Sequence, residues 1–170
     1  MTKTTLFSAL AVVLILGGLA WYSQGAKNPT PATGADNSVV TGEESLTVSE
    51  KSYDFGVISM KAGVVSRDFV VTNNSAKAIN LNQVYTSCMC TTATLITKQG
   101  EVGPFGMPGH GLSAPAVKVA LAPGEELTVR AAFDPAAHGP AGVGKIDRVI
   151  TLSGPDFSPL ELGISATVKP

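Results

Sequence analysis

The side chains best able to do chemistry in this chain are two cysteines, two histidines and one methionine. Cys88 and Cys90 are separated by a single residue and are the only cysteines, and His110 and His138 are the only histidines. Met107 lies in a Gly/Pro-rich stretch three residues before His110. Thiolate, thioether and imidazole together are the ligand types that select copper, above all Cu(I). We therefore take Cys88, Cys90, Met107, His110 and His138 as candidate metal ligands, with copper as the candidate ion.

Several interpretations of the cysteine pair stay open. In an extended strand, Cys88 and Cys90 would point to the same face, with Cα atoms about 6.5–7 Å apart, and could converge on a soft ion. A disulfide needs Cα atoms about 4.4–6.8 Å apart, and therefore a bulge or turn at Met89. Small buried hydrophobes and intermolecular pairing are further alternatives. The spacing fits neither a zinc finger nor the C-x-x-C pair of thioredoxin-type redox enzymes.

The rest of the chain lacks recognisable catalytic sets. The carboxylates Asp54, Asp134 and Asp147 are isolated from one another, as expected for turn and strand-end residues. Nucleophile-elbow, P-loop and dinucleotide-binding fingerprints are absent from the sequence. The formal net charge is −1 and no stretch concentrates Lys or Arg, which argues against nucleic-acid binding. We expect a binding or structural protein rather than an enzyme.

An uncharged apolar run occupies residues 6–22. Its length is at the short end of what spans a bilayer, and Trp21 and Tyr22 stand where aromatic rings prefer the membrane interface. We predict a single-pass membrane anchor, with the C-terminal part outside the cytoplasm, in the periplasm or at the cell surface. A cleaved signal peptide stays open, since cleavage after Ala20 fits a small-residue site although it lies inside the apolar run. Both alternatives export the remaining chain.

Two further regions follow the apolar run. Residues 23–44 are rich in Pro, Thr, Gly and Ala, as in a flexible linker. Residues 45–170 contain short alternating runs between turns, and in the run 64–72 we expect Val65, Phe69 and Val71 on or near the core. This pattern predicts an all-β, immunoglobulin-like antiparallel β-sandwich of about eight strands. The predicted strands are 45–48, 51–58, 64–72, 79–85, 90–96, 117–121, 127–133, 148–152 and 160–168. Residues 97–116 break the pattern and are expected to form an extended loop.

An ordered set of motifs carries a family resemblance. The set comprises Y-D-F-G-V-I at 53–58, F-V-V-T-N at 69–73, S-C-M-C-T at 87–91, A-P-G-E at 122–125 and F-D-P at 133–135. Over residues 46–168 it resembles the bacterial domain-of-unknown-function family 1573. The resemblance implies an immunoglobulin-type sandwich related to ASH and major-sperm-protein-like domains, and export from the cytoplasm, without a settled activity. Two departures are Met89, where the family usually has glycine, and the long segment 97–116.

Three functions compete at this point. The first is an extracytoplasmic binding or structural module, anchored in the membrane by residues 6–22, with an envelope protein as its candidate partner. The second is a Cu(I)-binding protein that uses the C-x-C segment and the Met/His loop. A thiol redox enzyme is the third.

Overall fold

The computed structural model describes residues 45–109 and 116–170, which form an all-β unit. The predicted anchor 6–22, the predicted linker 23–44 and His110 lie outside the described residues. In the part of the chain that the structure describes, no helix is long and apolar enough to cross a membrane. The elements are β1 (Leu46–Val48), β2 (Ser52–Ser59), η1 (Met60–Ala62), β3 (Val65–Asn73), β4 (Ile79–Leu81), β5 (Gln83–Thr86), β6 (Thr91–Thr97), β7 (Gly100–Phe105), β8 (Val119–Leu121), β9 (Glu126–Phe133), η2 (Gly139–Gly142), β10 (Gly144–Gly154) and β11 (Phe157–Lys169).

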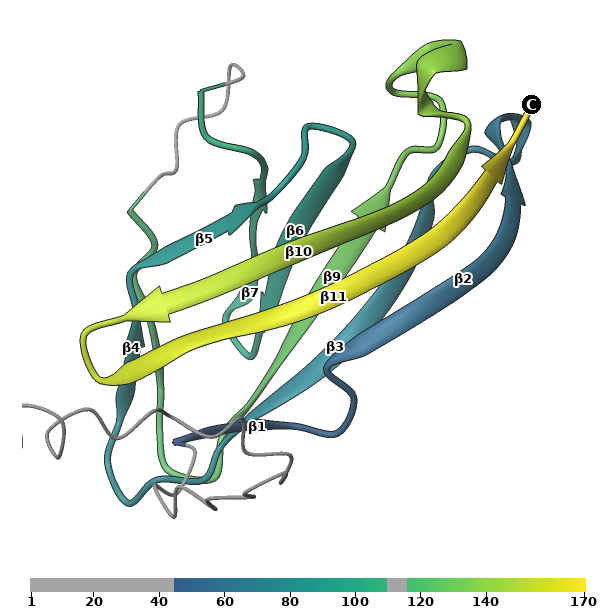
Figure 1. The fold of residues 1–170 in the computed structure, drawn as a ribbon. Helices are drawn as coiled ribbons and strands as arrows, with labels where there is room; N and C mark the ends of the chain where they lie inside the picture. The colour runs from purple at the N-terminus through teal and green to yellow at the C-terminus, as the bar shows by residue number, and fades with distance from the viewer. Residues whose placement is uncertain (1–44, 110–115) are drawn as a thin grey trace, which may run out of the picture. The chain divides into compact units, whose positions relative to one another are not determined.

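The strands form two main sheets that lie one behind the other, as in a sandwich (Figure 1). One sheet has the order β1-β3-β9-β6-β7 and the other has the order β2-β11-β10-β5, while β4 and β8 make a small separate ladder. The predicted sandwich is thus confirmed at the level of an all-β fold. One pair differs from the antiparallel expectation, because β2 runs parallel to β11. The chain crosses from the first sheet to the second after β1, and Gly163 N donates to Lys51 O at 2.7 Å where β2 joins β11.

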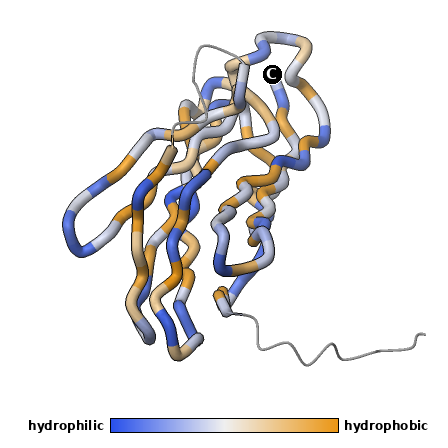
Figure 2. The backbone as a smooth tube through the Cα atoms, turned by 90° about the vertical axis from the view of Figure 1, so that its left-hand side faces the viewer, coloured by the Kyte–Doolittle hydropathy of each residue, from blue (hydrophilic) through white to orange (hydrophobic). Residues whose placement is uncertain are grey.

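The two-residue alternation of apolar side chains builds the core. In β9 every second residue from Leu127 to Phe133 is buried, and β11 shows the same alternation from Leu160 to Val168. Figure 2 shows hydrophobic and hydrophilic residues alternating along the strands. Each fully buried large apolar side chain contributes about 1.5–3 kcal/mol to stability. Of the predicted core residues, Phe69 and Val71 are buried and Val65 is partly buried against the core.

Two local predictions differ from the structure. Within the segment 97–116, which we expected to be a loop, residues 100–105 form strand β7, paired with β6. This strand contains Gly103 and Pro104, which are tolerated because β7 is an edge strand with a single partner. The predicted strand 79–85 divides at Asn82 into β4 and β5. The backbone of Asn82 bonds to Ser153 O and Val117 N at 3.0 Å each, which lets the chain change partners from β8 to β10.

Candidate metal centre

The two cysteines lie in the turn that joins β5 to β6, which we call the cysteine turn (residues 87–90). Thr91 N donates to Cys88 O at 3.1 Å and closes the turn. The buried Thr86 hydroxyl lies 3.0 Å from Cys88 O and 2.9 Å from Thr91 O. This side chain can therefore donate a hydrogen bond to the backbone carbonyls of the turn. The prediction that Cys90 begins an extended strand is therefore wrong by one residue, because β6 begins at Thr91. The chain turns at Met89, as it must if the two thiols are to approach each other closely.

A second turn, after β9, carries His138. Asp134 N donates to Cys90 O at 2.9 Å, which joins this turn directly to the cysteine turn. The Asp134 carboxylate accepts from Ala136 N at 2.9 Å, and Gly139 N donates to Ala136 O at 2.9 Å. These bonds bend the chain back, so that His138 lies immediately before η2. The interpretation of Asp134 as a turn residue agrees with these contacts.

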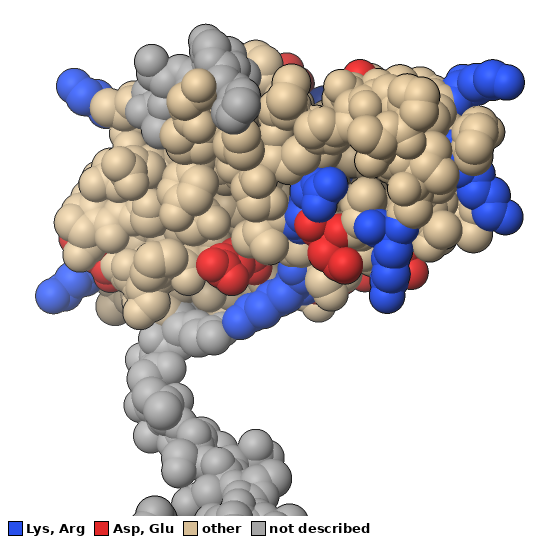
Figure 3. Space-filling model, turned by 45° about the horizontal axis from the view of Figure 1, so that its top comes forward, with Lys and Arg blue, Asp and Glu red and all other residues tan. Residues whose placement is uncertain are grey.

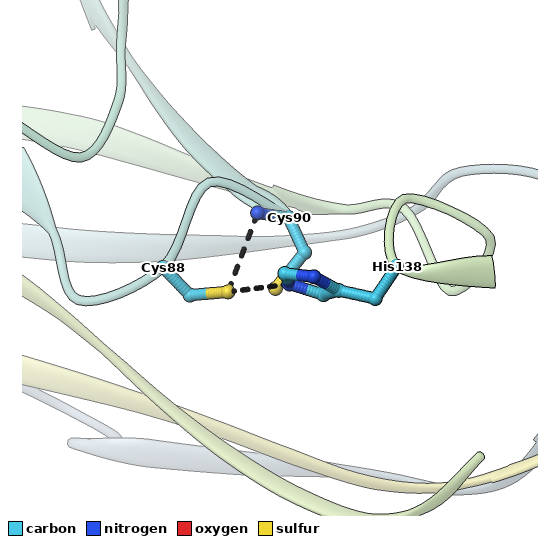
Figure 4. A group of neighbouring side chains, drawn as sticks. All are labelled: Cys88, Cys90 and His138. Atoms are coloured by element: carbon cyan, nitrogen blue, oxygen red, sulfur yellow. Dashed lines mark hydrogen bonds between the residues drawn. The ribbon is translucent and has the colours of Figure 1, made fainter. Parts of the chain in front are cut away.

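Three donor atoms meet between the two turns (Figure 4). The sulfurs of Cys88 and Cys90 and a ring nitrogen of His138 all lie within 4.8 Å of one another. Cys88 Sγ lies 3.2 Å from His138 Nε2, and Cys90 N donates to Cys88 Sγ at 3.4 Å. Cys88 is 9% exposed and Cys90 is 3% exposed, whereas His138 is exposed. The sulfurs thus form the inner wall of the site, and the imidazole forms its solvent side.

Arg148 supplies a positive charge to this group. Its Nε donates to Cys90 Sγ at 3.3 Å, and one of its terminal nitrogens donates to Asp147 O at 2.8 Å. Burial alone would raise the pKa of the Cys88 thiol. The hydrogen bonds from Cys90 and His138 and the charge of Arg148 outweigh this effect and lower the Cys88 pKa from 9.0 to about 7. Burial and the hydrogen bond with Cys88 raise the pKa of the Cys90 thiol.

The five predicted ligands have different outcomes. Cys88, Cys90 and His138 converge, as the copper hypothesis requires. His110 lies outside the described residues. Met107 is half-buried, and its neighbour Gly106 accepts from Thr86 N at 3.2 Å, which places this backbone beside the end of β5. The role of Met107 as a ligand stays a prediction.

Sequence reasoning missed Arg148, although the strand pattern contains a signal for it. In β10, Ile146 and Ile150 are buried, and a residue midway between them faces the same side of the strand. Arg148 is therefore a charged residue at an inward-facing position, where a charge needs a partner. Its partner, Cys90, lies far away in the sequence. The alternation in β10 could have marked Arg148 as an inward-facing charge, but it could not have identified Cys90 Sγ as its partner.

Charged residues elsewhere on the molecule are dispersed. On the face in Figure 3, several Lys and Arg side chains lie at the rim, and others are mixed with Asp and Glu. Among the described residues, Arg67 pairs with Glu50 and Arg130 pairs with Asp68. Exposed pairs of this kind contribute little to stability, about 0–1 kcal/mol each. Among the described residues, the cysteine–histidine–arginine group is distinguished from them by its two buried thiols.

A comparison with one solved structure supports the fold. An uncharacterised protein from Porphyromonas gingivalis W83 is similar in structure, with a TM-score of 0.50 and 17% identity over 72% of this chain and 46% of that one. The chain therefore aligns with less than half of that relative. The ASH/PapD-like domain 7 of human CEP192 is similar over 84% of this chain and 97% of that one, with a TM-score of 0.45 and 10% identity. A comparison with curated proteins finds no match.

A family model matches the first part of the β-unit. It covers residues 46–105, which include the Y-D-F-G-V-I motif, the cysteine turn and β7. The resemblance seen in the sequence motifs is thereby confirmed over these residues. The chain contains an all-β, sandwich-like domain whose residues 46–105 match DUF1573, a family described as proteins of unknown function.

Proposed function

We propose that this chain is an extracytoplasmic Cu(I)-binding protein, with Cys88, Cys90 and His138 as the ligands. The observation that carries the proposal is the convergence of two sulfurs and one imidazole nitrogen within 4.8 Å of one another. Thiolates are soft ligands that favour Cu(I), and imidazole completes a set that copper accepts. Structural zinc sites almost always have four protein ligands, and a set of two cysteines and one histidine binds zinc only with a water as the fourth ligand, so it is the softness of the two thiolates that favours Cu(I).

The separations between the donors fit a small ion. Metal–nitrogen and metal–sulfur bonds are about 2.0–2.3 Å long, so two donors that share one ion lie at most about 4.6 Å apart. Cys88 Sγ and His138 Nε2, at 3.2 Å, already satisfy this limit. The other separations are no greater than 4.8 Å, so small side-chain rotations are enough to close the set. The turns themselves need not move.

The direct test is Cu(I) binding by the reduced full-length chain in competition with a chromogenic chelator. We expect one Cu(I) per chain and loss of that binding in the double variant Cys88→Ser/Cys90→Ser. Met89→Leu is a matched control, because Met89 is 51% exposed and lies between the cysteines, so the change removes a sulfur without altering the three donors. A wild-type chain that leaves all the copper with the chelator would refute the proposal.

The membrane anchor is part of the same proposal. An uncharged run at residues 6–22 followed by a Pro/Gly-rich linker at 23–44 would hold the domain near the outer face of a membrane. The surface of the domain would then be accessible to an envelope protein that delivers or receives copper. We expect the chain to remain with the membrane after a high-salt wash. We also expect a membrane-impermeant thiol reagent to label a cysteine placed at the 62% exposed Val57 (Val57→Cys in the Cys88→Ser/Cys90→Ser chain) in spheroplasts, and labelling only after lysis would contradict the proposed orientation.

Thiol–disulfide exchange is a second candidate function, favoured by the turn at Met89. With their sulfurs within 4.8 Å, Cys88 and Cys90 could close a disulfide. They would lose two electrons and two protons to a partner's disulfide, which would be reduced to two thiols. A thiol count on chain purified rapidly from its native compartment, with free thiols trapped, tests this candidate. Two free thiols in every molecule would exclude it.

A further inference from the structure

Arg148 is held against the site by the backbone as well as by its own contacts. The next residue, Val149, exchanges two hydrogen bonds with Ser87 at the start of the cysteine turn. Ser87 N donates to Val149 O and Val149 N donates to Ser87 Oγ, each at 2.9 Å. This pairing fixes β10 relative to the cysteine turn. The inward-facing guanidinium of Arg148 is then positioned 3.3 Å from Cys90 Sγ.

The charge of Arg148 acts on the whole site. It interacts electrostatically with both sulfurs, not only with the Cys90 sulfur that it contacts. Two thiolates and a neutral imidazole carry two negative charges. With a monovalent ion this set keeps one negative charge, which Arg148 balances. With a divalent ion the set is already neutral, and Arg148 leaves an uncompensated positive charge beside buried sulfurs.

We infer that Arg148 is a specificity-determining residue that makes the Cys88, Cys90 and His138 site prefer a monovalent soft cation over a divalent one. The inference rests on the proposed Cu(I) function and deepens it. Its physical basis is the cost of net charge in a partly buried site, where electrostatic interactions are stronger than in water. Arg148 touches a ligand sulfur through a hydrogen bond, so it acts through the ligands rather than as one of them.

The alternative is that Arg148 only supports the turn. A purely structural role predicts that its removal weakens the binding of every metal ion to a similar degree. A charge-based role predicts a change in the ratio of two affinities. The ratio of Cu(I) affinity to Zn(II) affinity therefore separates the two roles, because a general loss of structure cancels in it.

The experiment compares the reduced full-length chain with three variants, using Cu(I) and Zn(II) competition against chromogenic chelators. For Arg148→Gln we expect the ratio of Cu(I) to Zn(II) affinity to fall by roughly tenfold or more, since one unit of nearby charge is removed. Arg148→Lys keeps the charge and should retain most of the ratio. Arg130→Gln, which removes an arginine that pairs with Asp68 on the surface, should leave the ratio unchanged.

The outcomes are distinguishable. If the wild-type chain binds Cu(I) and Arg148→Gln lowers both affinities equally or leaves the ratio intact, the inference is overturned while the copper site stands. If the ratio of Cu(I) to Zn(II) affinity falls as far in Arg148→Lys as in Arg148→Gln, the charge is not the cause of the preference and the inference is also overturned. If the wild-type chain binds no Cu(I), the proposed function fails first. Circular dichroism of each variant checks that the fold is retained.

Discussion

Two turns of this domain enclose buried polar groups, and they do so in different ways. At the end of β3, Asn73 is fully buried, and its amide donates to Lys77 O at 2.8 Å and to Leu121 O at 2.9 Å. Its carbonyl oxygen accepts from Ser75 N at 2.9 Å and from the Ser75 hydroxyl at 2.7 Å. Every hydrogen-bonding position of this side chain is thus occupied by backbone or hydroxyl groups. Such saturation is typical of a residue that holds a turn together.

The two thiols of the cysteine turn are also buried, but they face each other and the His138 ring. The Cys88 and Cys90 sulfurs and the His138 ring nitrogen converge, and the sulfurs have hydrogen-bond partners at 3.2–3.4 Å, ordinary distances for sulfur. Soft donors that converge on a point can share an ion, which hard groups bonded to separate carbonyls cannot do. On the proposed function, the Asn73 turn would serve stability and the cysteine turn would serve metal binding.

The largest expected effect concerns metal-dependent stability. A ligand that binds only the folded chain stabilises it by about 4 kcal/mol when its free concentration is a thousand times its Kd. We expect Cu(I) to raise the free energy of unfolding of the wild-type chain on this scale, and not that of Cys88→Ser/Cys90→Ser. Urea unfolding of the full-length chain under anaerobic conditions, with and without Cu(I), measures both. Equal stabilisation of the two proteins would place the copper elsewhere.

The second effect tests the other turn. Asn73→Ala removes the side-chain partner of the buried Leu121 O and of Ser75 N, and we expect it to lower the free energy of unfolding by about 1–3 kcal/mol. Its Cu(I) affinity should be that of the wild type. Asn74→Ala is the matched control, since Asn74 is exposed and its side chain donates to Thr47 Oγ1 at 2.8 Å. A lower Cu(I) affinity in a folded Asn73→Ala chain would contradict the separate roles of the two turns.

A smaller effect is expected from His138. Because its side chain is exposed, His138→Ala should change stability little, yet it removes one of three donors. We expect Cu(I) affinity to fall by about ten- to a hundredfold, with the two sulfurs retaining residual binding. Chelator competition provides the measurement. Met107→Leu and His110→Ala, tested in the same way, show whether the other two predicted ligands take part. Unchanged affinity in His138→Ala would remove it from the ligand set.

The smallest effect is the pH dependence of the metal-free chain. The Cys88 pKa falls from 9.0 to about 7 on folding, so its thiolate stabilises the folded state fully above pH 9, and this stabilisation is lost as the pH drops through 7. The free energy of unfolding of the reduced chain should therefore gain a rising contribution between pH 7 and 9. The raised pKa of Cys90 contributes the opposite slope, but only above about pH 9. In Cys88→Ser, the free energy of unfolding should not increase between pH 7 and 9. A similar increase in that variant would show that another group causes it.

Sequence patterns predicted the sandwich more completely than the site. Alternation in runs such as 64–72 and 127–133 reports which residues face the core, because burial imposes that period locally. The parallel pairing of β2 with β11 and the change of partners at Asn82 depend on distant segments, so no local pattern shows them. Edge strand β7 was not predicted, because its Gly and Pro residues are typical of a loop.

The same limit applies to the metal site. C-x-C spacing and a histidine in a Gly/Pro turn were enough to propose Cys88, Cys90 and His138. They could not show that a bond from Asp134 N to Cys90 O brings the two turns together. Arg148 was missed because its sulfur partner is 58 positions away in the chain.

X-ray absorption at the copper edge of the Cu(I)-loaded full-length chain tests the central claim most directly. The account predicts two sulfur neighbours and one nitrogen neighbour around Cu(I) in the wild-type chain, and loss of the nitrogen contribution in His138→Ala. A copper ion surrounded only by nitrogen or oxygen, or a wild-type spectrum that persists in Cys88→Ser/Cys90→Ser, would contradict it.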